Sequence, residues 1–138
     1  RLDEMRAAIG LVQLDKLSAA NARRKVLTER YFANLDGVNG VTIPFRHFDR
    51  GRPSYHIMPI LLGSGIDRQA VIGRLAEKGV QASVHYPFIP DFSGYRGIRG
   101  NVPKCAAVSA RELTLPLYPT MTLDECDYVC DSLKECLV

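Results

Sequence analysis

The sequence SYHIMPILL at residues 54–62 decides the fold class, because it begins the clearest strand–helix–strand passage of the chain. Both alternating faces of this stretch are apolar, which is typical of a strand that is covered on both sides. Pro59 cannot donate a hydrogen bond to a neighbouring strand, so it suggests a sheet edge or a bulge. The turn signal Gly63-Ser64-Gly65 ends the strand.

A helix is predicted directly after this turn. Asp67 stands near its start, Gly79 lies just past its end, and its apolar stripe consists of Val71, Ile72, Leu75 and Ala76. Residues 80–85 then predict a second strand. This strand either lies parallel to the first one, through a crossover, or pairs elsewhere in a mixed sheet.

The segment before residues 54–62 predicts one long helix, or a helix with a bend, from residue 2 to about residue 35, with Asp3 as its N-cap. The first half of this helix, residues 2–14, is apolar on several sides. A helix that is apolar all round is normally covered all round, and a small domain cannot supply that cover. We therefore expect the helix to contact another domain or subunit. A short strand is predicted over residues 41–45.

The remaining segments complete the fold. Residues 86–101 predict a loop, residues 102–113 a helix, and residues 114–119 an extended segment. Thr122 and Glu125 form a capping box, which predicts the start of a last helix. The sequence thus predicts an α+β fold, with a small, mostly antiparallel or mixed sheet of three to four strands. Helices pack on this sheet, and a long N-terminal helix precedes it.

Composition limits the function classes. The chain has 138 residues, which is enough for one domain with its own core. Its net charge of +3 is small and scattered, so we expect no nucleic-acid partner. Its apolar runs are too short to span a membrane, and we expect no signal peptide.

Three of the four cysteines fall on one face of the predicted last helix: Cys126, Cys130 and Cys136. Cysteine behaves as a small hydrophobe in a core, so a structural role is favoured, with oxidised pairs as the alternative. A zinc site would need four ligands and no histidine lies nearby, so we expect no metal. Reduced thiols are typical of a cytoplasmic protein.

The candidate site is the end of the second predicted strand, Ser83-Val84-His85-Tyr86-Pro87. Loops at strand ends commonly hold functional groups, and histidine can donate or accept a hydrogen bond near neutral pH. The alternative is a half-buried structural histidine, with Tyr86 packed on the following prolines. We expect His56 to be a hydrogen-bonded core residue, His47 to be solvated and Tyr118 to be a hydrophobic plug.

Several blocks of the chain resemble the DegT/DnrJ/EryC1/StrS aminotransferases, in the order and with the spacing of that family. The blocks are RLDEMRAAIGLVQL at residues 1–14, Ser54-Tyr55-His56 with the apolar strand that follows, LAEKGV at 75–80, SVHYP at 83–87, and LTLPLYP at 113–119 with Met121-Thr122. Each block is weak alone, but together they cover essentially the whole chain.

The resemblance implies the small domain of a fold type I aminotransferase. Such enzymes are usually homodimers, and they act in sugar and polysaccharide biosynthesis. They move an amino group from glutamate to a keto sugar linked to a nucleotide. Their pyridoxal phosphate and catalytic lysine belong to a large domain. Residues 1–138 would then be a single C-terminal small domain that is inactive alone, contains no catalytic residue and joins a homodimer through its N-terminal helix.

The resemblance also implies which residues bind ligands. His85 and Tyr86 match a segment that faces the nucleotide sugar, where they would position the substrate and contact its anionic part. Arg96 lies in a loop that resembles a variable substrate-facing region. Arg1 is the remnant of an element that reaches the cofactor phosphate of the neighbouring subunit. The alternative function is a stand-alone binding or dimerisation module that shares ancestry with the enzyme.

Overall fold

The computed structural model describes residues 3–47, 51, 53–95 and 100–137. The helices are α1 (Glu4–Asn34), α2 (Arg68–Glu77), α3 (Pro103–Arg111) and α4 (Leu123–Cys136), with short 3-10 helices at Ile89–Asp91 and Ser93–Tyr95. The strands are β1 (Val41–Thr42), β2 (Met58–Leu62) and β3 (Glu112–Leu115). They form one antiparallel sheet in the order β1-β2-β3, which confirms the predicted α+β class.

The central strand of the sheet is β2, so Pro59 does not mark an edge or a bulge as predicted. Its partner across the sheet explains why a proline is tolerated. Pro59 lies opposite Thr114 of β3, whose N–H and C=O are both bonded to Ser83 on the far side. This pair therefore needs no hydrogen bond between β2 and β3. On the other side, β1 ends at Thr42, which pairs with Leu61 before the level of Pro59 is reached.

Several element boundaries differ from the prediction. The strand expected over residues 54–62 begins only at Met58, and the strand expected over residues 80–85 is reduced to one antiparallel bridge between Ser83 and Thr114. The helix expected to reach residue 113 ends at Arg111, because β3 takes the next four residues. The Ser83 segment runs antiparallel to β3 and hence parallel to β2, so the passage through α2 crosses over β3.

The end of α2 directs the chain toward this bridge. Gly79 has a φ of +75°, its N–H donates to the carbonyl of Ala76, and the N–H of Val80 donates to that of Leu75, both at 2.9 Å. This is the Schellman arrangement, which favours glycine in the left-handed region. Because Val80 is buried, the chain turns onto the core before it reaches His85.

The core lies between the sheet and the helices α1, α2 and α4. Alternate residues of β2 are buried, and α4 buries the face that its spacing predicts, including all three of its cysteines as free thiols. The core residues are Leu27, Tyr31, Leu35, Met58, Ile60, Leu62, Val71, Leu75, Val80, Leu113, Leu115, Met121, Cys126, Val129, Cys130, Leu133 and Cys136. The structural role expected for the α4 cysteines is therefore confirmed.

Polar contacts join α1 to the elements beside it. Arg30 donates two hydrogen bonds of 2.7 Å to the carboxylate of Asp127 on α4, and Asn34 donates a third at 2.6 Å. These bonds, first of all those from Arg30, lower the pKa of Asp127 to about 2. The Tyr31 hydroxyl donates to the carbonyl of Pro116 at 2.8 Å, directly after β3, and burial raises its pKa.

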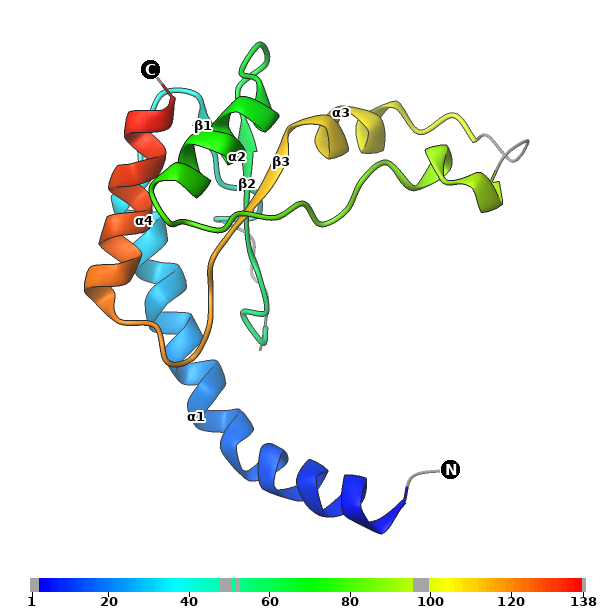
Figure 1. Ribbon diagram of the computed structural model, residues 1–138, viewed down its shortest axis with the longest axis vertical. Helices are drawn as coiled ribbons and strands as arrows, with labels where there is room; N and C mark the ends of the chain where they lie inside the picture. Colours follow the sequence, from blue (N-terminus) through cyan, green and yellow to red (C-terminus); the bar gives the residue numbers. More distant parts are fainter. Residues whose placement is uncertain (1–2, 48–50, 52, 96–99, 138) are drawn as a thin grey trace.

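The first half of α1 is uncovered, as its sequence predicts. Its exposed apolar residues include Met5, Ile9, Leu11, Val12 and Leu14, which are 51–79% exposed. The buried residues of this helix all lie in its second half. Figure 1 shows the first half extending past the sheet and the other helices. Within the described ranges, no helix combines the length and the apolar character needed to cross a membrane.

Candidate functional site

The segment after α2 holds His85 against the open edge of β3. Ser83 exchanges two backbone hydrogen bonds with Thr114, at 3.1 and 2.8 Å, and thereby fixes the chain two residues before the histidine. The backbone N–H of His85 donates to Glu112 Oε2 at 2.8 Å. The rings of His85 and Tyr86 pack edge to face, with centroids 5.2 Å apart. The peptide bond between these two residues is cis.

Two polar side chains of β3 support the imidazole. Successive side chains of a strand point to opposite faces, so Glu112 and Thr114 alternate with the core leucines 113 and 115. The Thr114 hydroxyl donates to Glu112 Oε1 and lies 3.1 Å from His85 Nδ1. Glu112 is only 4% exposed. A buried carboxylate is costly unless it is hydrogen-bonded, and here both oxygens accept.

His85 lines a hollow of about 180 Å³ together with His56, Gln81, Ser83 and residues 114–117. His56 is exposed in this hollow, so the prediction of a hydrogen-bonded core histidine is wrong. The reason is that β2 begins two residues later, so His56 lies in the irregular segment before the strand. Sites for small molecules usually occupy about 300–1,000 Å³, so this hollow is large enough for only part of such a ligand.

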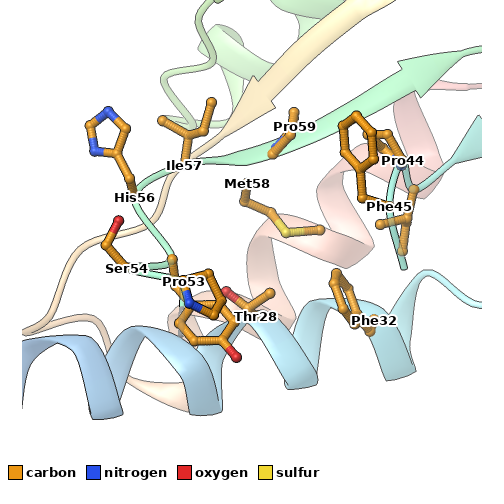
Figure 2. A pocket seen from close by; sticks show the side chains of 12 residues that line it. Thr28, Phe32, Pro44, Phe45, Pro53, Ser54, His56, Ile57, Met58 and Pro59 are labelled. Atoms are coloured by element: carbon orange, nitrogen blue, oxygen red, sulfur yellow. The ribbon is translucent and has the colours of Figure 1, made fainter. Parts of the chain in front are cut away.

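A second hollow, of about 400 Å³, lies between α1 and β2 and is mainly apolar. Figure 2 shows Thr28 and Phe32 rising from α1 toward Met58, while the ring of His56 points away from α1. The buried hydroxyl of Thr28 has no hydrogen-bond partner within the described part of the chain. The residues lining this groove include no lysine, arginine, aspartate or glutamate. The lining of the His85 hollow also lacks these charged residues, but it brings two histidines together with Gln81, Ser83 and Thr114.

The other predicted site residues have mixed outcomes. Tyr86 is 63% exposed beside His85, whereas Arg96 and Arg1 lie outside the described residues. His47 is exposed as expected. Tyr118 is 42% exposed, so it does not plug the core. The sequence prediction missed Glu112 and Thr114, although the alternation of Glu-Leu-Thr-Leu before Pro116 is a strand signal.

Comparisons with known proteins agree with this architecture. Residues 1–134 match the DegT/DnrJ/EryC1/StrS aminotransferase family. A relative from Streptomyces venezuelae, dTDP-3-amino-3,4,6-trideoxy-alpha-D-glucose transaminase, is 27% identical over 139 residues, which cover 98% of this chain and 36% of that protein. The chain thus spans about a third of the length of this relative.

Solved structures share the fold. The putative sugar aminotransferase Spr1654 from Streptococcus pneumoniae, in its PMP form, has a TM-score of 0.88 and 28% identity, over 99% of this chain and 35% of that one. PseC from Helicobacter pylori has a TM-score of 0.92, over 99% of this chain and 38% of that one; at 21% identity it supports the fold alone. With a family match over nearly its whole length, the chain belongs to the DegT/DnrJ/EryC1/StrS aminotransferase family.

Proposed function

We propose that this chain is the C-terminal small domain of a pyridoxal-phosphate-dependent enzyme that moves an amino group from glutamate to a nucleotide-linked keto sugar. One observation carries the proposal: this chain belongs to the family, and its His85 lines a small hollow. The name of the Streptomyces relative, a transaminase of a dTDP-linked sugar, supports a nucleotide-sugar substrate. In this proposal, His85 and Tyr86 form one wall of the substrate site.

The lysines favour a cofactor site outside this chain. Three of them are ion-paired: Lys25 with Glu29 at 2.6 Å, Lys78 with Glu135 at 2.5 Å and Lys134 with Asp131 at 2.9 Å. Hydrogen bonds to these carboxylates raise the pKa of each amine, whereas a lysine that forms a Schiff base is activated by a lowered pKa. None of the lysines that the structure describes lines the His85 hollow. These residues do not fit pyridoxal phosphate, so we assign its binding to the remainder of a longer polypeptide.

Uncovered apolar surface supports a partner for this chain. The first half of α1 and the arm formed by residues 86–95 and 100–111 both project to one side of the molecule in Figure 1. This arm exposes Ile89, Phe92, Tyr95 and Val108 to 44–48%, and α3 has no buried residue. Apolar surface on this scale marks interaction sites. We propose that the large domain of the same polypeptide and a second subunit cover it in a homodimer.

The proposed role of His85 is tested by separating the two half-reactions of the native full-length protein. The first half-reaction uses only glutamate, and the second uses the keto sugar. We expect His85→Ala to leave the glutamate half-reaction unchanged and to slow the sugar half-reaction by about tenfold to a hundredfold, the cost of one hydrogen bond to a charged group. His47→Ala, which changes another exposed histidine, is the control and should alter neither. A loss in the glutamate half-reaction would contradict a substrate-side role.

The inactivity of the chain by itself is tested with pyridoxal phosphate alone. We expect titration of the 138-residue chain to give no absorption band of lysine-bound cofactor beyond that of a control with chemically blocked surface lysines. A saturable band, or turnover of glutamate and keto sugar by the chain, would refute the proposal and favour a self-contained module. The mass of the native protein is a second check, because the relative is about three times as long as the chain.

A further inference from the structure

Hydrogen bonds with β3 hold His85 in place, and the sequence motif around His85 does not predict them. We propose that Glu112 and Thr114 are positioning residues that keep the proton of neutral His85 on Nδ1 and so present the Nε2 lone pair to the ligand. The nature of that ligand, a nucleotide sugar, rests on the proposed function. The proton arrangement itself follows from the donors and acceptors of the three side chains.

The first step concerns the carboxylate of Glu112. Its Oε2 accepts the backbone N–H of His85 at 2.8 Å, and its Oε1 accepts the hydroxyl proton of Thr114. Both carboxylate oxygens of Glu112 accept, so the single hydroxyl proton of Thr114 is directed at Glu112. Thr114 is itself only 4% exposed, which leaves almost no access for water to accept that proton instead.

The second step concerns the imidazole. The Thr114 hydroxyl uses its only proton in the hydrogen bond to Glu112. Its oxygen can therefore only accept from His85 Nδ1, which lies 3.1 Å away. The hydrogen bond between them therefore requires the proton to be on Nδ1. Ser83 Oγ lies 3.4 Å from the same nitrogen, a longer contact that fits a second acceptor.

The third step concerns the nitrogen left over. Among the residues that the structure describes, Nε2 of His85 has no hydrogen-bond partner, and the side chain lines the hollow. A neutral His85 held this way accepts a hydrogen bond from a sugar hydroxyl. A protonated His85 keeps Nδ1 on Thr114 and donates from Nε2. In both charge states of the ring, Nε2 is the atom that forms the hydrogen bond with the ligand.

Nitrogen NMR of the 138-residue chain tests the assignment without ligand or turnover, so its failure is distinguishable from failure of the proposed function. At a pH where the ring is neutral, we expect Nδ1 of His85 to have a pyrrole-like shift and Nε2 a pyridine-like shift. Glu112→Gln is the decisive variant. Its amide oxygen still accepts the His85 N–H, but its NH2 group now donates to Thr114. The threonine hydroxyl must then donate to Nδ1, so the two shifts should exchange.

Matched variants isolate the hydroxyl that transmits this effect. Thr114→Ser keeps the hydroxyl and should keep the proton on Nδ1, as should Ser83→Ala, which removes only the longer contact. Backbone amide spectra confirm that each variant is folded. A wild-type His85 with its proton on Nε2, an unchanged pattern in folded Glu112→Gln, or an exchange of shifts in Ser83→Ala would each overturn the proposal. The wild-type and Ser83→Ala measurements decide the matter even if Glu112→Gln does not fold.

Discussion

Replacing Tyr31 by phenylalanine tests how α1 holds the segment that follows β3. The substitution removes one hydroxyl and leaves the buried ring, so no cavity forms. The hydroxyl donates to the Pro116 carbonyl at 2.8 Å, and Tyr31 is 0% exposed. Loss of such a bond leaves a carbonyl without its partner, which costs about 1–3 kcal/mol. Tyr128→Phe is the matched control, because its hydroxyl donates to the Lys78 carbonyl at 2.9 Å but the residue is 55% exposed.

Urea unfolding at 25 °C measures the difference. The slope of unfolding free energy against urea is about 1–3 kcal/mol per molar for small proteins. At a slope of about 2 kcal/mol per molar, Tyr31→Phe should lower the midpoint by about 0.5–1.5 M with an unchanged slope. Water replaces the lost bond at Tyr128, so the control should cost less than about 0.5 kcal/mol. Equal losses in both variants, or no loss at Tyr31, would refute the argument that burial sets the cost.

Three further changes test other features. Asp127→Asn should cost about 1 kcal/mol or less near pH 7, because the pair with Arg30 is partly exposed. The folded pKa of Asp127 is lowered from 3.8 to about 2, so its contribution is present above pH 4 and is lost as pH falls toward 2; urea midpoints of wild type and variant should therefore converge over that window. Wild type should self-associate in sedimentation experiments at high concentration, whereas glutamine at Met5, Ile9 and Val12 should give a monomer; a wild-type monomer would contradict the role assigned to α1. Gly79→Ala should cost about 1–2 kcal/mol in unfolding free energy from its φ of +75° alone, because no atom lies within 4 Å of the added Cβ; an unchanged urea midpoint would disprove this.

Elements with local signals are predicted well from the sequence. The N-cap at Asp3, the capping box at Thr122 and the left-handed Gly79 act through neighbouring backbone groups, so short patterns reveal them. Strand ends depend on partners far along the chain instead. Residues 80–82 have a strand-like sequence but form no ladder, and the bridge at Ser83 exists because Thr114 lies beside it.

The candidate site is predicted only in part for the same reason. His85 is identifiable because a motif ends a predicted strand, but its support comes from Glu112, 27 residues later. The helix predicted through residue 113 conceals the alternation of Glu112 with Thr114. A strand that starts at residue 54 puts His56 in the core, but β2 begins only at Met58. Tyr118 is exposed because the chain turns between β3 and α4, and the sequence alone does not show this turn.

All four residues of β3 are buried, and alternate ones serve opposite faces of the sheet. A shift of one position against β2 would move a carboxylate toward the leucine-rich side and a leucine beside His85. No intermediate alignment keeps one face correct while the other is lost. The register of β3 against β2 therefore determines both the packing of the core and the support of the His85 imidazole. A sheet in the wrong register would lose the two together.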